Sequence, residues 1–197
     1  MEKIKNENAS DFNVQTMRKK LATLYEKISS HGNVVAPEVE KKVRAEIDIV
    51  GKQMIAGILG EQNFNTIKNE KLRVVANDLY LHCTLINFID FDFYDLADFA
   101  ADNLPSYFDV YEGNLKTILY QISTKNLVEL NDTKCKVLLL INSTMEHELT
   151  LDELGQILDQ IRKTPGNENV DITWSYTFRN NLTPKNLRLD VLVTKES

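Results

Sequence analysis

The sequence predicts an α+β protein in which an N-terminal α-helical region, a helical hairpin plus a third helix, packs on a C-terminal mixed sheet. Apolar residues recur in steps of three and four through the first half, whereas strand-like and helical patterns follow each other through the second half. With 7 Gly and 4 Pro, the chain offers no long flexible linker, so the two regions are expected to dock. We place the helical region at residues 1–88 and the α/β region at 89–197.

The composition is that of a soluble globular protein, with 43% hydrophobic and 26% charged residues among 197. A net charge of −6 disfavours nucleic acid and anionic membranes as partners, because both attract clustered Lys and Arg. No apolar run approaches the length of a membrane span or a signal peptide. Cys83 and Cys135 lie in or beside apolar runs, which is typical of reduced buried thiols. We therefore expect a cytoplasmic protein.

Residues 1–12 are polar and are predicted to be frayed. One amphipathic helix follows, with a stripe formed by Val14, Met17, Leu21, Leu24 and Ile28. Stop signals at 29–33 and Pro37, which suits a first helical turn, introduce a second helix. Its stripe is formed by Val39, Val43, Ile47, Val50, Met54 and Ile58. Two interpretations of the first stripe are open. Either it packs into the chain's own core, or it forms a coiled-coil interface with another copy or a partner.

A third helix is predicted from about Thr66 to Phe88, with apolar residues at Leu72, Val75, Leu79, Leu85 and Ile86. Acidic and aromatic residues then alternate from Asp90 to Asp98. The local pattern indicates that Asp90 or Asp92 caps a helix running to about Asn103, with the other acids near its first turn. A metal site is the alternative, but this segment lacks the Gly and the terminal Glu of a calcium-binding loop.

From residue 106 onward the pattern predicts the order β-α-β-α-β-β. A strand at 107–111 precedes a helix with a stripe from Leu115 to Ile122, and a fully apolar strand follows at 137–141. Thr150 and Glu153 have capping-box spacing at the start of the next helix, which should end at Pro165-Gly166.

The last two strands are predicted at 170–178 and 187–193. The first alternates apolar and polar residues without a slip, which is typical of a strand with one buried face. The turn-rich connection at 180–186 predicts that these two strands form an antiparallel hairpin. The helical connections predict parallel pairing among the earlier strands.

One set of motifs has the order and spacing of a known family. These motifs are Ile89-Asp-Phe-Asp-Phe-Tyr-Asp-Leu96, Glu112-Gly-Asn114 opening a helix, Lys136-Val-Leu-Leu-Leu-Ile-Asn-Ser-Thr144, Leu151-Asp-Glu-Leu-Gly-Gln-Ile-Leu158 and Leu187-Arg-Leu-Asp-Val-Leu-Val193. From Ile89 to Lys195 the chain resembles the C-terminal domain of the bacterial tubulin homologue FtsZ. The resemblance implies that family's mixed sheet, with the third helix in the place of its long central helix. The family's glycine-rich GTP-binding loop has no counterpart in this sequence, so GTP binding is not expected.

The resemblance also implies a role for Asp90, Asp92 and Asp95. In the family, a loop at this position reaches into the nucleotide site of the next subunit and orients the attacking water. Asp92 and Asp95 match its two acids, whereas Asp90 replaces an Asn and Tyr94 replaces an Ala. These acids would therefore form an interaction loop directed at a tubulin-like GTPase.

No catalytic residue, metal ligand or cofactor is assigned. The residues His31, His82 and His147 lack the spacing of a helical zinc site, and no Gly-x-Ser-x-Gly nucleophile motif occurs. The sequence therefore favours a non-enzymatic interaction or assembly module that binds a protein partner, such as a tubulin-like GTPase, or another copy of itself. A stand-alone small-ligand or metabolic domain, with a pocket lined by Trp174, Tyr176 and Phe178, is the second hypothesis. A metal-dependent hydrolase using the Asp90 to Asp98 acids ranks last.

Overall fold

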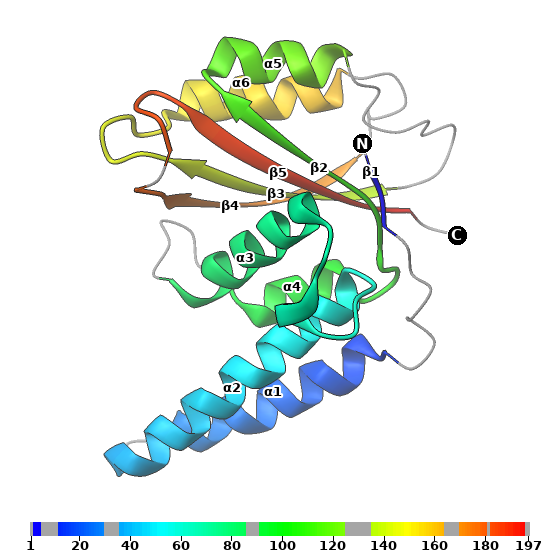
Figure 1. Cartoon of the computed structure of the whole chain (residues 1–197), viewed down its shortest axis with the longest axis vertical. Coiled ribbons are helices and arrows are strands. Elements are labelled where there is room, and N and C mark those ends of the chain that lie inside the picture. Colours follow the sequence, from blue (N-terminus) through cyan, green and yellow to red (C-terminus); the bar gives the residue numbers. More distant parts are fainter. Residues whose placement is uncertain are drawn as a thin grey trace.

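The chain folds into an α+β structure, in which helices lie on both faces of a mixed sheet (Figure 1). The computed structural model describes residues 2–4, 12–29, 36–85, 91–124, 135–163, 170–180 and 182–195. Helices lie mostly in the N-terminal half and strands in the C-terminal half, which confirms the predicted class. In chain order the elements are β1 (Glu2–Lys3), α1 (Val14–Ile28), α2 (Pro37–Ile58), a 3₁₀ turn (Phe64–Thr66), α3 (Glu70–Thr84), α4 (Phe93–Phe99), β2 (Pro105–Gly113), α5 (Leu115–Thr124), β3 (Cys135–Ser143), α6 (Leu151–Arg162), β4 (Asp171–Phe178) and β5 (Leu187–Lys195).

Within the described residues, the sheet has five strands in the order β1-β2-β5-β3-β4. Strand β5 is antiparallel to β2 and β3, and β4 is parallel to β3. Helices α1 to α4 lie on one side of the sheet, while α5 and α6 cover the other (Figure 1). One apolar core joins α1–α4 to the sheet through residues such as Phe108, Leu140 and Leu192. The helical region therefore docks on the sheet as predicted, although the proposed boundary at residue 88 lies outside the described residues.

The predicted hairpin between 170–178 and 187–193 is wrong. Strand β5 does not pair with β4, but inserts between β2 and β3. The physical reason is burial, because Leu187, Leu189 and Val191 face the α5–α6 side while Asp190 and Leu192 are buried under the helices on the other side. A strand buried on both faces belongs in the middle of a sheet, which leaves β4 at the edge.

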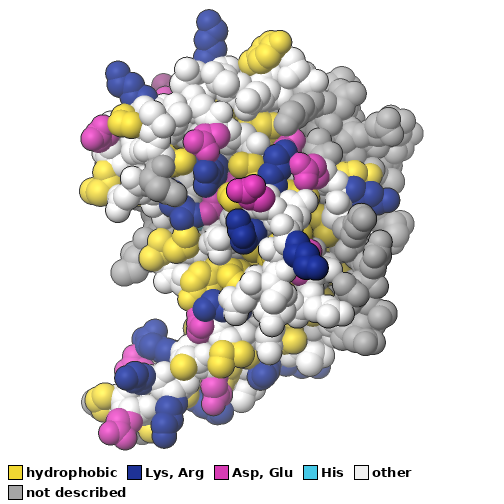
Figure 2. Space-filling view, in the orientation of Figure 1, with side chains coloured by type: hydrophobic (Ala, Val, Ile, Leu, Met, Phe, Trp, Pro, Cys, Tyr) yellow, Lys and Arg dark blue, Asp and Glu magenta, His cyan; other side chains and the backbone are white. Residues whose placement is uncertain are grey.

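The α1–α2 hairpin packs its stripe inside the chain's own core. Leu21 and Leu24 are buried, and Met17 and Ile28 are partly buried against the same core. The structure thus shows the first of the two interpretations of this stripe. The end of the hairpin where α1 stops and α2 begins projects from the rest of the molecule (Figures 1 and 2), and Val39 is exposed there.

Close packing fixes α4 against α2. A Cβ atom built on Gly51 would lie 2.2 Å from Cζ of Phe93, so the ring packs directly on the α2 backbone. The ion pair between Arg18 and Asp98, at 2.8 Å, ties α4 to α1 as well. These contacts set where the acidic start of α4 lies.

Two sequence-based boundaries need correction. Residues 2–4 are not frayed, because β1 pairs with β2 and the Ile4 side chain is buried in the core. The third helix begins four residues later than predicted, since Asn69 accepts a hydrogen bond from the N–H of Leu72 and caps α3. Ile86 and the Pro165-Gly166 stop signal lie outside the described residues.

Other predictions are confirmed. Strand β3 is buried along most of its length, and Thr150 with Glu153 forms the predicted capping box of α6. Cys83 and Cys135 are buried and are not joined by a disulfide bond. Among the described helices, none is long and apolar enough to cross a membrane.

Candidate functional site

The acids predicted as an interaction loop cap α4. The Asp92 carboxylate accepts hydrogen bonds from the N–H groups of Tyr94 at 2.6 Å and Asp95 at 3.2 Å. The Asp95 carboxylate accepts one in return from the Asp92 N–H at 2.9 Å. This reciprocal pair is a capping box, so the local interpretation is confirmed and Asp92 is the cap. Helix α4 ends at Phe99, earlier than predicted, and Asp90 lies outside the described residues.

Helix α1 lies beside this cap. The ring centroids of Tyr25 and Tyr94 lie 5.4 Å apart. The pKa of Tyr25 is raised to about 12, mainly by burial and then by the negative charge of Asp92. The structure therefore supports a structural role for Asp92, and brings its carboxylate close to α1.

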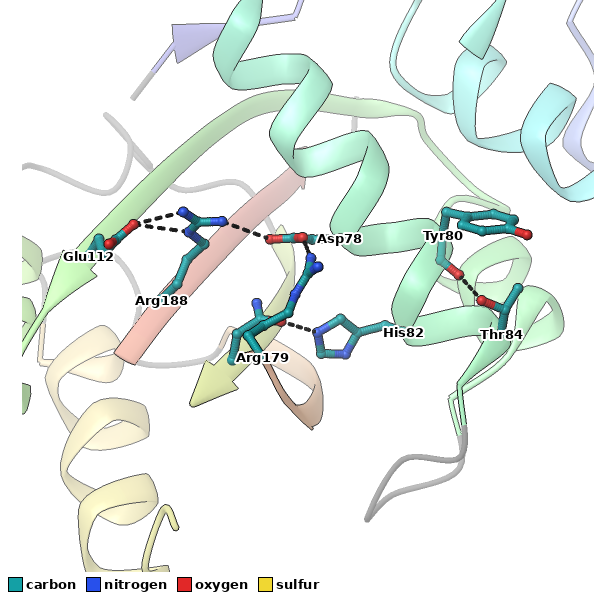
Figure 3. Close-up of polar contacts among 8 residues, drawn as sticks. Asp78, Tyr80, His82, Thr84, Glu112, Arg179 and Arg188 are labelled. Atoms are coloured by element: carbon teal, nitrogen blue, oxygen red, sulfur yellow. Dashed lines mark hydrogen bonds and ion pairs between the residues drawn. The ribbon is translucent and has the colours of Figure 1, made fainter. Parts of the chain in front are cut away.

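A second group of polar side chains, part of which Figure 3 shows, lies between α3 and the sheet, and we call it the buried polar cluster. It gathers residues from five elements and from the segment that follows β4. Its members are Asp78, His82, Glu112, Asn142, Ser175, Arg179, Arg188 and Asp190. Sequence patterns did not predict this cluster. Two signals were available, namely Asp78 and His82 four apart on one face of α3, and Asp190 within an apolar strand.

Two arginines hold the acids of the cluster together. Arg179 forms an ion pair with Asp78, and Arg188 reaches between Asp78, at 3.8 Å, and Glu112, at 2.8 Å (Figure 3). The Asp78 side chain is almost fully buried, whereas Glu112 lies at the solvent edge. Buried acids require such partners, because an unpaired charge in a protein interior is strongly unfavourable.

His82 is neutral and has a defined tautomer. Burial lowers its pKa to about 4. Its Nε2 lies 3.2 Å from Oδ1 of Asn142, and that oxygen also accepts a hydrogen bond from Nε of Arg179. Since Oδ1 is only an acceptor, Nε2 carries the proton. Nδ1 therefore accepts the hydroxyl proton of Ser175, 2.8 Å away.

Asp190 is the unusual member of the cluster. It is fully buried on β5, and neither carboxylate oxygen has a hydrogen-bond partner within the described part of the chain. Burial raises its pKa to about 7, although the charges of Arg188 and Arg179 act in the opposite direction. With Asp190 protonated, the charges of Asp78, Glu112 and the two arginines sum to zero. Ionisation of Asp190 would therefore add an uncompensated charge.

The cluster does not form an accessible active site. Ser175, His82 and Asn142 make a hydrogen-bonded chain like that of a serine nucleophile and its base. All three side chains are fully buried, so a substrate cannot contact Ser175 without displacement of α3 or β4. The arrangement is suited to holding α3 on the sheet.

An open pocket lies between β4 and the start of α6. It has a volume of about 250 Å³ and is lined by Glu148, Leu149, Thr150, Leu151, Leu154, Trp174 and Tyr176. Of the three aromatic residues considered for a cavity, Trp174 and Tyr176 line this pocket, while Phe178 packs on Tyr176 with ring centroids 5.6 Å apart. Leu151 is 85% exposed, and Met145, three residues before Glu148 in the sequence, is 74% exposed. The exposed Leu151 side chain therefore forms part of the pocket wall.

Hydrogen bonds fix the pocket wall. The Tyr176 hydroxyl accepts the N–H of Leu149 at 3.0 Å and lies 2.7 Å from the Ser143 hydroxyl. The Thr150 hydroxyl accepts the N–H of Glu153 at 3.2 Å, which fixes the first turn of α6. Both flanks of the pocket are therefore ordered by the protein itself.

Thr150→Ala should lower the free energy of unfolding by about 1 kcal/mol, because the first turn of α6 loses its cap. Urea denaturation measures this change. Thr150→Ser keeps the hydroxyl and should remain within a few tenths of a kcal/mol of the original protein. Equal losses in both variants would show that the methyl group, not the cap, is responsible.

No three His, Cys, Asp or Glu side chains among the described residues are grouped to hold a metal ion. Comparisons of the sequence with family models and with curated proteins found no match. Functional inference therefore rests on the fold and on three regions, namely the acidic cap of α4, the buried polar cluster and the pocket beside β4.

Proposed function

We propose that the protein is a non-enzymatic protein-interaction module whose docking surface is the outer edge of β4 together with the adjoining pocket. The observation that carries this proposal is the coincidence of an edge strand, an apolar pocket beside it and the exposed Leu151 in the pocket wall. Edge strands present backbone groups to which another chain can bind, and apolar pockets typically mark binding sites. The burial of Ser175 and His82 further supports a role other than catalysis.

The second candidate is binding of a small apolar ligand in the same pocket. Trp174, Tyr176 and Leu154 give it suitable walls. Its volume of about 250 Å³ lies below the roughly 300 to 1,000 Å³ of sites for drug-sized ligands. Such a size favours one side chain of a protein partner over a whole metabolite.

A photo-crosslinking amino acid placed at Leu151 tests the proposed function. In extracts of the source cells, we expect it to form discrete adducts, whose partner is identified by mass spectrometry and then purified. The purified partner should bind the original protein and bind Leu151→Glu at least about tenfold more weakly. An acidic residue suits the first turn of a helix, so Leu151→Glu should keep the fold.

The control position is Tyr120, which is 68% exposed and lies on α5, not on α6. A crosslinker at Tyr120 should give none of the Leu151 adducts. Identical adducts from both positions, or adducts from neither, would contradict a docking surface beside β4.

The resemblance to FtsZ supports a more specific proposal, in which Asp92 and Asp95 contact a tubulin-like GTPase. Because both acids cap α4, alanine substitutions would confuse a lost contact with a lost cap. Asp92→Asn with Asp95→Asn removes both charges, and Asn remains a good capping residue. We expect the original protein, but not this double variant, to change the GTP turnover of a purified FtsZ. Unchanged turnover at saturating protein would refute this specific proposal.

A further inference from the structure

We infer that the partner docks as an extended segment, which adds a strand to β4, places an apolar side chain in the pocket and carries Lys or Arg beside it. This inference rests on the proposed function and specifies the chemistry of the partner. Three features carry it, namely the direction of the β4 backbone groups, the position of the pocket and the charge around it.

Successive residues of β4 point their backbone N–H and C=O groups toward opposite edges of the strand. The Arg179 N–H, just after β4, donates to the Ser143 carbonyl of β3 at 2.6 Å. In a parallel pair, every second residue bonds to the neighbouring strand, so Thr173 and Ser175 point their backbone groups toward β3. The N–H and C=O groups of Ile172 and Trp174 therefore point toward the outer edge, along which no described strand lies.

The pocket lies where an added strand would place a side chain. Strand side chains alternate between faces, so every second residue of the partner would share the sheet face that carries Trp174. The pocket opens on this face between Trp174 and the first turn of α6. One leucine or phenylalanine side chain could enter it and contact Leu151. Main-chain bonding to an edge strand with a pocket for alternate side chains is the general mode of strand addition.

Charge selects the flanking residues of the partner. Glu148 lines the pocket, and Glu146 and Asp152 are exposed close to it in the sequence. The segment 144–160 contains no Lys or Arg. Positive side chains on the partner would complement this acidic rim and speed association.

The same charges argue against a second copy of this chain as the occupant. Strand β4 itself, from Asp171 to Phe178, has an acid and no Lys or Arg. Pairing two copies along β4 would bring two acidic rims together without positive side chains from either strand. A partner segment with basic residues fits the surface better.

Trp174 provides a direct test, because it is the one tryptophan in the sequence and lines the pocket. The probes are eight-residue peptides, the length of β4, that lack tryptophan and have a central Leu or Phe. One pool carries Lys and Arg around the centre and the other carries Asp and Glu. We expect the basic pool to shift Trp174 emission, with affinity that falls as salt rises, and the acidic pool to bind at least about tenfold more weakly.

Two paired comparisons test the added strand. Ile172→Pro removes an outward N–H and should weaken peptide binding at least about tenfold relative to Ile172→Ala, which keeps that N–H. N-methylation of alternate residues in the peptide should weaken binding to the original protein in the same way. The peptide comparison remains valid even if Ile172→Pro fails to fold.

Some outcomes would overturn the inference while leaving the proposed function intact. Equal binding of the two pools, or no effect of N-methylation, would contradict the basic extended segment. Self-association that Leu151→Glu abolishes, without peptide binding, would identify a second copy as the occupant. Absence of both peptide binding and the Leu151 crosslinks would refute the inference and the proposed function together.

Discussion

Asp78→Asn should lower the free energy of unfolding by about 3–5 kcal/mol, because it leaves Arg179 and Arg188 without their buried partner. The carboxylate of Asp78 is almost fully buried, and Arg179 and Arg188 are themselves largely covered. An asparagine has nearly the same shape, so the loss reports the missing charge and not a cavity. Urea denaturation at neutral pH measures it.

Glu112→Gln is the matched control for Asp78→Asn. Glu112 bonds to the same Arg188 at 2.8 Å, but its side chain is 42% exposed. Exposed ion pairs contribute about 0.2–1 kcal/mol, so this variant should lose no more than that. Similar losses in Asp78→Asn and Glu112→Gln would contradict the assignment of Asp78 as the central acid of the cluster.

The stability of the protein should depend on pH through two buried groups with opposite effects. The pKa of Asp190 is raised to about 7 from an ordinary value of 3.8. The folded state therefore binds this proton more tightly, and the stability it contributes is present below 3.8 and lost as the pH rises to about 7. The pKa of His82 is lowered to about 4 from 6.5. Its neutral form is favoured by folding, so its contribution is present above 6.5 and lost as the pH falls to about 4.

The two slopes largely cancel between about pH 4 and 6.5, since each is at most about 1.4 kcal/mol per pH unit. Asp190→Asn should remove the Asp190 slope and leave that of His82. The free energy of unfolding of this variant should therefore rise by roughly 3 kcal/mol as the pH increases from about 4 to 6.5. His82→Gln should show the opposite trend and lose stability as the pH rises toward 7. Urea denaturation across this range measures both.

Asp159→Asn, at an exposed position on α6, is the control and should follow the original protein. Parallel pH profiles for Asp190→Asn, His82→Gln and the original protein would show that neither group titrates with a shifted pKa. A slope in only one variant would identify the single group responsible.

Local patterns predicted the elements of this fold well, because local interactions determine them. Helix α1 has the predicted stripe, and Thr150 with Glu153 caps α6 through bonds only three residues apart. Asp92 caps α4 for the same reason. The sequence left open whether Asp90 or Asp92 caps α4, and the hydrogen bonds identify Asp92 as the cap.

The order of the strands could not be predicted in this way, because it depends on contacts between distant residues. The short connection before β5 indicated a hairpin, but burial on both faces determined its position between β2 and β3. The alternating pattern of β4 also predicted that Ser175 and Thr177 face solvent, but both are buried under the helices. Their partners, such as His82, are about a hundred residues away in the chain.

The central position of β5 has a consequence for the way the protein folds during synthesis. β5 is the last described strand to leave the ribosome, and until it arrives β2 and β3 have no common neighbour. In the nascent chain, β2 and the β3–β4 pair would not be joined, and the edge of β3 that pairs with β5 would be uncovered. Such late, long-range pairing slows folding and exposes strands that chaperones recognise. Formation of the complete sheet therefore cannot precede the synthesis of residues 187–195.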